Sequence, residues 1–569
     1  MLIKDFLHNH TDHIINTISN NTKTLGNNIT NDTVYTDLSL FNGDHNIFNK
    51  INKCITPFGE NKLKETLCYP IKNIEILKKR QKLIANLSNK NLNKNLKPKL
   101  QYINDNYEDI LWFWKERTKE EETLLKSLYF ENKYLKLLNK SSLFLQGYQY
   151  YSNIAGPLLT LLSPLVMIIM PYIIVRYVTK LPLPFNSYLK ILFLYYKVMV
   201  THKQYYNIGF SIVLPLVSYV QGLINIVSVC KNNHRITKQL HKRLNIVKKL
   251  VEFYEDTNEY FKDFKDIVPK INLNVKVNVS DTFNYFSNKG HISYEYKRIL
   301  EILPNLNPYI EHISNVDMYF GLNNLINIDN KHRYSITNYG SSLKIDDMWF
   351  PLIKDDNVVT NNANMKKNKH LLITGPNAGG KSTYIRNILL NILFSQTIGI
   401  CPCKKANVPI YSLIRSHIDI PDKEGYESLF EAEINRFSDL LNDINNVEKL
   451  GEKSFIAVDE IFNSTNYIEG VSASYSVCDE ISKMKKLNSI VTTHYNYLTK
   501  LEKSTKGKFK NYKVIIKKIG DKIDFKYKIK KGISNDFIAL DLLNKREFNK
   551  NIIKNAKNIK NKLDNYLKL

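Results

Sequence analysis

A glycine-rich segment offers the clearest chemistry in this chain of 569 residues. It follows an apolar run at residues 371–373 and has the form G-x-x-x-x-G-K-[ST], in which successive backbone N–H groups surround a phosphate. A helix expected from Ser382 to about Phe394 points its positive end at the same anion. The pattern predicts a nucleoside triphosphate ligand. The residues expected to bind it are Gly375, Pro376, Asn377, Ala378, Gly379, Gly380, Lys381, Ser382 and Thr383.

Two side chains at the end of this segment have separate expected roles. The Lys381 amine can reach the β- and γ-phosphates, and the Ser382 hydroxyl can ligate Mg²⁺. The expected cofactors are therefore a nucleoside triphosphate, ATP or a relative, and Mg²⁺.

An acidic pair ends a second buried-strand pattern, at residues 455–458. Asp459 is expected to hold Mg²⁺ through water, and Glu460 to orient the attacking water. A third strand, at residues 489–493, runs into His494, which can contact the γ-phosphate. A solvated acidic pair and a surface histidine are the plain alternatives, and the phosphate loop upstream favours the catalytic interpretation.

A helix between these strands is expected to begin at Ser428. This serine has the type and position of an N-cap, and Glu431 completes a capping box. The apolar residues of the helix have the spacing of one buried face. They are Ile434, Phe437, Leu440 and Leu441.

Together these motifs resemble the ATPase domain of the MutS mismatch-repair family. The likeness lies in residues 374–386 and 492–495, and the Ser428-x-Phe430-x-x-Glu433 spacing is similar to the family's signature helix. It covers roughly residues 345–560. A less specific likeness at residues 35–90, with Thr-Pro-Phe-Gly at 56–59 and Arg-Gln at 80–81, resembles the start of the family's helical core and lever.

The resemblance implies several properties of the protein. It implies ATP hydrolysis in a dimeric site, where Ser428 reaches the γ-phosphate held by the other subunit of a homodimer or of a pair with a related MutS-type protein. It also implies mismatched or branched DNA as a partner. The C-terminal segments at 532–534 and 539–543 resemble the family's dimerising tail.

The sequence departs from the family pattern in two places. The acidic pair is usually followed by Gly-Arg-Gly-Thr-Ser, whereas residues 461–466 read Ile-Phe-Asn-Ser-Thr-Asn. The segment before the core likeness has about 40–50 residues and no Phe-x-Glu wedge, and a domain needs about 100 residues. We therefore expect a short variant that resembles MutS-related proteins lacking the mismatch-reading and connector domains.

The middle of the chain carries two long uncharged runs. Ile154–Val175 is uncharged for 22 residues and Gln204–Cys230 for 27, and a bilayer-spanning helix needs about 20. Prolines spaced by seven and tyrosines at the ends are typical of membrane helices. Polar residues in the second run and a basic loop at 176–203 argue against a simple span. Both a membrane hairpin, as in some similar bacterial MutS-related proteins, and a buried helical pair stay open.

Composition limits the compartment and the partners. The formal charge of +27 attracts nucleic acid or anionic lipid without choosing between them. The six cysteines lack zinc-ligand spacing, which favours reduced thiols. Lys4, Asp5 and the polar stretch to Asn31 break any signal-peptide core. We expect an intracellular protein, in cytoplasm or nucleus, with membrane association left open, and not a secreted one.

The expected fold is multidomain, with a mainly α-helical core and lever region followed by an α/β P-loop (ABC-type) ATPase domain. A long charged helix is expected at about 112–138. Two functions follow: an ATP-dependent DNA-binding protein of the mismatch-repair type, or a membrane-associated ATPase with a role other than mismatch recognition. The expected segments are 1–34 (polar), 35–150 (core and lever, first half), 151–230 (apolar insertion, candidate membrane hairpin), 231–334 (lever, second half) and 335–569 (ATPase with C-terminal dimerising helices).

Overall fold

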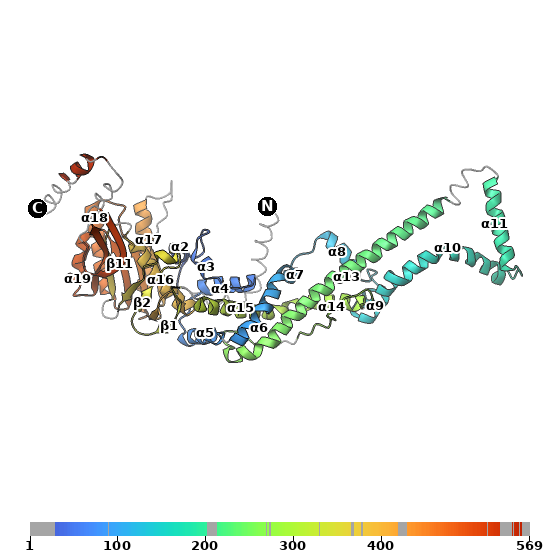
Figure 1. Cartoon of the computed structure of the whole chain (residues 1–569), viewed down its shortest axis with the longest axis horizontal. Helices are drawn as coiled ribbons and strands as arrows, with labels where there is room; N and C mark the ends of the chain where they lie inside the picture. Colours follow the sequence, from blue (N-terminus) through green and yellow to red (C-terminus); the bar gives the residue numbers. More distant parts are fainter. Residues whose placement is uncertain are drawn as a thin grey trace. The chain divides into compact units, whose positions relative to one another are not determined.

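The chain forms two compact units in a computed structural model (Figure 1). The first unit comprises described residues within 1–104, 260–270 and 311–569, and the second comprises 105–259 and 271–310. Helices dominate up to Asn327 and strands begin at Ser335, which confirms the expected fold class. The structure describes residues 29–88, 90–201, 213–268, 270–271, 275–328, 331–365, 369–376, 379–418, 429–519, 522–534, 549, 551–556 and 558–559.

A six-stranded sheet in the order β11-β10-β4-β9-β8-β7 forms the centre of the first unit. Neighbours from β10 to β7 are parallel, and β11 is antiparallel to β10. The register pairs Thr374 with Thr493 and Asp459 with Thr492, so β4, β9 and β8 end at the same edge. The bounds are β4 His370–Thr374, β7 Leu413–His417, β8 Ser454–Asp459, β9 Leu487–Thr493, β10 Phe509–Ile519 and β11 Lys522–Lys531.

A second sheet has five strands in the order β3-β2-β6-β1-β5. Helix α16, Lys381–Thr397, contacts β5 of this sheet and β8 and β9 of the other. It is buried almost continuously from Tyr384 to Thr397, which explains its apolar composition. The helix expected after the phosphate loop is thereby confirmed. The strands are β1 Ser335–Tyr339, β2 Lys344–Met348, β3 Asn361–Asn364, β5 Ile400–Cys401 and β6 Lys405–Val408.

Helix α17, Leu429–Lys449, follows the expected signature segment but buries a different stripe. Phe437 and Leu440 are buried as expected, whereas Ile434 is 42% exposed. The Glu433 side chain is 1% exposed and is buried where Ile434 was expected to be. Positions 433, 437, 440 and 444 are spaced by the helical period, so they lie on one face of the helix. Other helices of this part are α18, Tyr467–Lys483, and α19, Leu501–Ser504.

The N-terminal helices of the first unit are fixed by polar contacts to α15, Asn307–Asn327. Thr56 caps α4, Pro57–Cys68, and Pro57 occupies its first turn. Buried Asp317 accepts hydrogen bonds from the N–H groups of Ile55 and Thr56 and from the Thr56 hydroxyl, at 2.7–2.9 Å. Further helices are α2 Asp32–Asp37, α3 Ile47–Ile51, α5 Ile74–Asn86 and α6 Lys90–Asp105.

The second unit is helical, and its first segment corrects one expectation. The long helix at 112–138 is wrong: α7 ends at Leu111, and α8 begins at Lys119. A capping box of Thr118 and Glu121 starts the new helix, because these side chains satisfy its free N–H groups. The helices are α7 Tyr107–Leu111, α8 Lys119–Lys126, α9 Ser142–Tyr150, α10 Gly156–Ile173, α11 Phe185–Thr201, α13 Leu214–Phe261 and α14 Lys289–Glu301.

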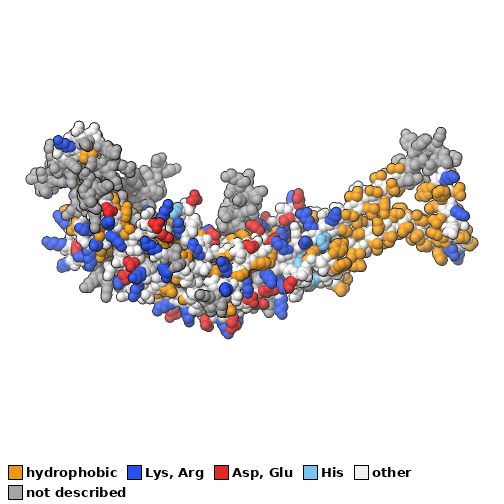
Figure 2. Space-filling model, in the orientation of Figure 1, with side chains coloured by type: hydrophobic (Ala, Val, Ile, Leu, Met, Phe, Trp, Pro, Cys, Tyr) orange, Lys and Arg blue, Asp and Glu red, His pale blue; other side chains and the backbone are white. Residues whose placement is uncertain are grey.

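Two helices of the second unit have the length and apolar composition that crossing a bilayer requires. One is continuous over Ser142–Val178 and includes α10; the other covers Leu214–Phe264. None of the most apolar stretch of either helix is buried, so these stretches are not part of the core of the unit. Figure 2 shows them covered with apolar side chains. We call residues 151–201 and 213–230 the arm.

Candidate nucleotide site

The predicted phosphate loop, acidic pair and histidine meet at one edge of the six-stranded sheet. The phosphate loop leaves β4, the acidic pair ends β8, and His494 follows β9. Since β9 lies between β4 and β8, His494 and Glu460 come within ion-pair distance. Parallel strands that end together thus gather residues separated by more than 100 positions in the chain.

Backbone geometry at the phosphate loop requires glycine. Gly375 has φ +155° and Gly380 has φ +88°. A Cβ on Gly375 would come within 2.7 Å of the Val514 side chain, so an alanine there forces a rearrangement. Gly380 directly precedes α16, whose first turn contains Lys381, Ser382 and Thr383. Asn377 and Ala378, also predicted to bind phosphate, lie outside the described residues.

Lys381 is held inside the loop that it is expected to serve. Its side chain is 3% exposed, and Nζ donates to the carbonyl oxygens of Gly375 and Pro376 at 2.9 and 3.2 Å. Nζ also lies 3.3 Å from Glu460 Oε1. Burial lowers the pKa of the Lys381 amine, and Glu460 opposes that shift. The amine would bind a negatively charged phosphate at this position more strongly than it binds two neutral carbonyl groups.

Glu460 connects the three strand ends. It pairs with His494 Nε2 and with Lys381, and Asn463 donates to its Oε2 at 3.3 Å. Its backbone N–H donates to the carbonyl and hydroxyl oxygens of Thr492, both at 3.2 Å. Although burial opposes ionisation, His494 and Lys381 lower the pKa of Glu460 to about 2. In this arrangement Glu460 is a weak base, and it becomes a better one when Lys381 moves to a phosphate.

Asp459 and Ser382 fit a magnesium ion. Asp459 ends β8, and its carboxylate accepts a hydrogen bond from Thr492 through Oδ1; no other hydrogen bond to this carboxylate is found within the described part of the chain. One carboxylate and one hydroxyl suit Mg²⁺, which keeps several waters and takes its other ligands from phosphates. These two residues would hold the ion, which would neutralise charge on the β- and γ-phosphates.

A cavity of about 700 Å³ opens beside the loop, a size typical of small-molecule sites. Its walls combine the start of α16 and Glu460 with apolar residues before β3 and Tyr527 of β11. The apolar wall suits a planar base, and the α16 end suits phosphates. The wall residues that the motifs did not predict include Phe350, Ile353, Asp356, Val358, Asn361 and Tyr527.

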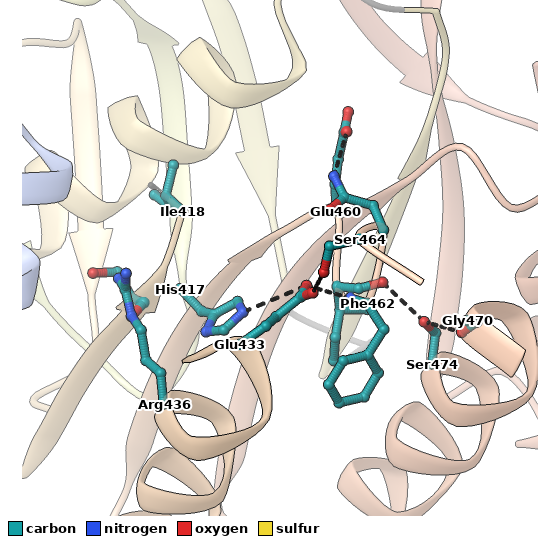
Figure 3. Close-up of polar contacts among 12 residues, drawn as sticks. His417, Ile418, Glu433, Arg436, Glu460, Phe462, Ser464, Gly470 and Ser474 are labelled. Carbon is teal, nitrogen blue, oxygen red and sulfur yellow. Dashed lines mark hydrogen bonds and ion pairs between the residues drawn. The ribbon is translucent and has the colours of Figure 1, made fainter. Parts of the chain in front are cut away.

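A buried carboxylate ties α17 to the loop after the acidic pair (Figure 3). Glu433 accepts hydrogen bonds from the Phe462 N–H at 2.5 Å and from the Ser464 hydroxyl at 2.6 Å. His417 Nε2, fully buried, lies 4.0 Å from Glu433 Oε1. Although burial opposes ionisation, His417 and these two hydrogen bonds keep the pKa of Glu433 below its ordinary value.

Phe462 occupies a strained backbone conformation in this loop. Its φ is +54°, a conformation that bulky residues rarely adopt. The Tyr495 hydroxyl donates to the Phe462 carbonyl at 2.8 Å. The ring centroid lies 5.7 Å from that of Phe437 and 6.1 Å from that of Phe430, both on α17. Backbone and ring contacts together hold the conformation.

The structure thus brings together Gly375, Gly380, Lys381, Asp459, Glu460 and His494. Ser428, predicted to act across a dimer, lies outside the described residues. Sequence patterns did not assign Thr492, Asn463 or Tyr495, and they gave Glu433 only as part of the signature spacing. The sequence did carry a sign of the contacts of Glu433, because this acid lies on the apolar face of the helix. A buried carboxylate requires hydrogen-bond partners.

Comparison with protein families gives two matches. Residues 371–564 match MutS domain V, and residues 27–141 match MutS domain III. The first match contains the whole predicted nucleotide site after the start of β4. The arm lies between the two matched ranges.

Individual relatives are similar over the C-terminal part. The chain is 31% identical over 220 residues to the DNA mismatch repair protein MutS of Persephonella marina, covering 38% of this chain and 25% of that protein. It is 29% identical over 274 residues to that of Finegoldia magna, covering 47% and 31%, and 33% identical over 201 residues to that of Clostridium kluyveri, covering 35% and 22%. The matched region thus spans about a quarter to a third of these relatives.

Proposed function

Because this chain belongs to the MutS family, we propose that it is a Mg²⁺-dependent ATPase acting on DNA in mismatch repair. The observation that carries the proposal is the meeting of Lys381, Asp459, Glu460 and His494 beside a cavity of nucleotide size. Lys381 binds the β- and γ-phosphates, Glu460 orients the attacking water, and His494 contacts the γ-phosphate. Asp459 and Ser382 hold Mg²⁺.

The contacts of Lys381 support a simple order of events. Lys381 rests on two carbonyl groups and on Glu460. Triphosphate binding draws the amine to the phosphates, and Glu460 then loses one of the two cations that lower its pKa. Binding therefore precedes activation of the base.

The nucleotide assignment is tested by two substitutions with matched controls. We expect Lys381→Ala to abolish ATP binding, and Glu460→Gln to bind ATP but turn it over at least about 100-fold more slowly. Lys405→Ala and Glu469→Gln change exposed residues of the same unit and should behave as wild type. Binding is measured by nucleotide fluorescence and turnover by phosphate release. Wild-type turnover in either site variant would overturn the assignment.

We propose that the active form is a dimer, a homodimer or a pair with a related MutS-type subunit, in which Ser428 of one subunit completes the site of the other. Family membership supports this, and within one subunit Glu433 and Phe462 connect α17, which follows Ser428 in the chain, to the loop after Glu460. A partner that engages the N-terminal end of α17 would thus be in mechanical contact with the base of its neighbour.

The DNA partner is proposed as mismatched or branched duplex, bound in an ATP-dependent way. Family membership and the net charge of +27 support it. The test compares affinity for matched, mismatched and four-way-junction DNA between 50 and 200 mM salt. Preference for mismatch or junction, with affinity falling steeply with salt, is expected. Equal affinity for all three DNAs at every salt concentration would refute the structural preference.

A second candidate function is a membrane-associated ATPase of this family, intracellular, with a role other than mismatch recognition. One observation favours it: the apolar stretches of the two arm helices are long enough to cross a bilayer and are unburied. The test is fractionation of the expressed full chain. Recovery with membranes that resists high salt supports this candidate, and recovery in the soluble fraction without detergent excludes it.

A further inference from the structure

In the arm the large apolar side chains face outward, which is the opposite of their arrangement in a water-soluble helical pair. Between Ile154 and Ile173, 11 large apolar side chains are 38–72% exposed. The less exposed positions of the same segment include Ala155, Gly156, Thr160 and Ser163. Small and polar residues thus face inward while leucine, isoleucine and methionine face outward. In water a helical pair buries the large apolar residues instead, so this pattern indicates an apolar surrounding.

The two arm helices contact each other through small groups. Cys230 Sγ lies 3.7 Å from the carbonyl oxygen of Asn153, near the base. Farther out, the Gly222 position faces the Thr160 side chain at 3.8 Å, and Tyr219 donates to the Leu161 carbonyl at 3.0 Å. These pairs run in opposite chain directions, so α10 and the start of α13 form an antiparallel hairpin. Close approach through small residues is the usual packing of helices in lipid.

Thr160 and Asn153 donate hydrogen bonds within the hairpin. Thr160 donates to the Gly156 carbonyl at 3.1 Å, and Asn153 donates to the Gln149 carbonyl at 2.7 Å. On the outward face Gln221 donates to Asn225 at 3.3 Å. Such local pairing is what a surrounding without water requires.

Aromatic residues mark the base of the hairpin. Tyr150 and Tyr151 are 57% and 59% exposed. Tyr285, from a distant segment, stacks on His234, one helical turn beyond Cys230, with Lys289 4.7 Å from its ring centroid. Exposed tyrosine beside basic groups is typical of the lipid headgroup region.

A similar group marks the tip. The Tyr172 ring contacts those of Phe185 and Tyr188, with centroids 4.9 and 5.4 Å apart, and Arg176 donates to its hydroxyl at 2.9 Å. From Tyr151 to Tyr172 a helix rises about 32 Å, close to the hydrocarbon thickness of about 30 Å. The two aromatic groups are therefore one bilayer core apart.

The charged side chains lie at the two ends of the hairpin and not along its apolar stretch. Between Glu131 and Glu252 the sequence has no acidic residue and 15 lysines and arginines. None of these lies between Ile154 and Val175, whereas Arg176 and Lys180 follow at once. Positive charge at both ends complements anionic headgroups on both leaflets, although basic residues at the tip run against the positive-inside tendency. Duplex DNA would need cations along the contact surface, and the arm has none along this stretch.

From these observations we propose that the arm is a membrane-inserted hairpin: α10 and the start of α13 cross the hydrocarbon core, and α11 lies in the headgroup region of the far leaflet. The inference deepens the second candidate function and rests on it. The nucleotide site belongs to the other unit of the chain, so ATP hydrolysis and insertion are separately measurable.

The test uses the full chain with vesicles of phosphatidylcholine and phosphatidylglycerol. Leu161→Lys with Leu165→Lys places two charges on outward positions, 56% and 54% exposed, near the middle of the hairpin. We expect the vesicle partition coefficient to fall at least about 100-fold. The matched control, Leu124→Lys with Leu450→Lys, changes leucines 45% and 73% exposed outside the arm, and should float like wild type. Phosphate release should be unchanged in both variants, which shows that they are folded.

Depth and direction are tested on the same preparation. Wild-type flotation should resist 1 M salt and alkaline carbonate, and Leu165→Trp fluorescence should be quenched by lipids brominated near the chain ends. Trypsin added outside sealed vesicles should spare Lys180 and Lys190 until detergent is added. Cleavage at these lysines in sealed vesicles would overturn the crossing.

Other occupants of the arm give different results, and each overturns the proposal. Release of wild type from vesicles by salt means surface adsorption. A lipid-free oligomer that the Leu161 and Leu165 double variant dissociates means that a second copy covers the arm. Loss of DNA affinity in that variant, together with a wild-type protein that never floats with vesicles, means that the arm clamps DNA.

One further outcome separates the two proposals. If flotation succeeds but neither protein hydrolyses ATP, the hairpin stands and the ATPase proposal fails.

Discussion

Removing the Glu433 carboxylate should uncouple α17 from the catalytic edge without emptying the nucleotide site. In Glu433→Ala the Phe462 N–H and the Ser464 hydroxyl lose their acceptor. Hydrogen bonds to a charged group contribute about 1.5–3 kcal/mol each, so the two together contribute about 3–6 kcal/mol. Relaxation of the positive φ at Phe462 returns roughly 1–2 kcal/mol. The free energy of unfolding should therefore fall by about 1–5 kcal/mol.

The kinetic effect should fall on turnover more than on binding. Phe462 is two residues from Glu460, so a loop freed at Phe462 displaces the base. A displacement of about 1 Å can lower a rate about 100-fold, and we expect kcat to fall roughly 10- to 100-fold. Lys381 and its loop are held by β4 and α16, so the nucleotide Kd should change less than about threefold.

Urea unfolding, nucleotide titration and phosphate release measure the three quantities. Asp439→Ala changes an exposed acid on the same helix and serves as the matched control. Glu433→Gln keeps the shape and one acceptor and should show a smaller loss. A Glu433→Ala protein with wild-type kcat and unfolding free energy would refute the reasoning, and so would an equal loss in the Asp439 control.

The remaining predictions concern the dimer, the loop and pH. A mixture of Ser428→Ala and Lys381→Ala proteins, each inactive, should recover about a quarter of wild-type phosphate release, because half of random dimers are mixed and each has one complete site; no recovery would exclude a trans role. Phe462→Gly should relieve the positive φ but lose the contacts of its ring with Phe437, and in urea it should unfold about 1–3 kcal/mol more easily; a more stable variant would contradict the packing argument. The pKa of Glu460 is lowered from 4.5 to about 2, so the ionised carboxylate stabilises the fold above pH 4.5, and this stabilisation is lost as pH falls toward 2. The difference in unfolding free energy between wild type and Glu460→Gln should therefore shrink over this range. A constant difference would refute the prediction.

Local patterns in the sequence predicted the strands and the helix that carry the candidate nucleotide site. The phosphate loop, the strand ending at Asp459 and the helix after Lys381 all depend on short-range periodicity and on residue types with special chemistry. Each is found within a few residues of its expected bounds, at β4, β8 and α16. The Thr56-Pro57 turn likewise begins α4, because capping is a local interaction.

Only the tertiary structure decided which side chains meet. The placement of β9 between β4 and β8 joins His494 to Glu460, and strand order is set by contacts between distant segments. The same holds for Glu433: helical spacing allowed Ile434 as the buried residue, and packing against the loop at Phe462 selected the acid. In the arm, composition determined two apolar helices, but only their pairing through Thr160 and Gly222 showed that the large apolar side chains face outward. Sequence periodicity specifies the faces of a helix, and the neighbours in space determine which face is buried.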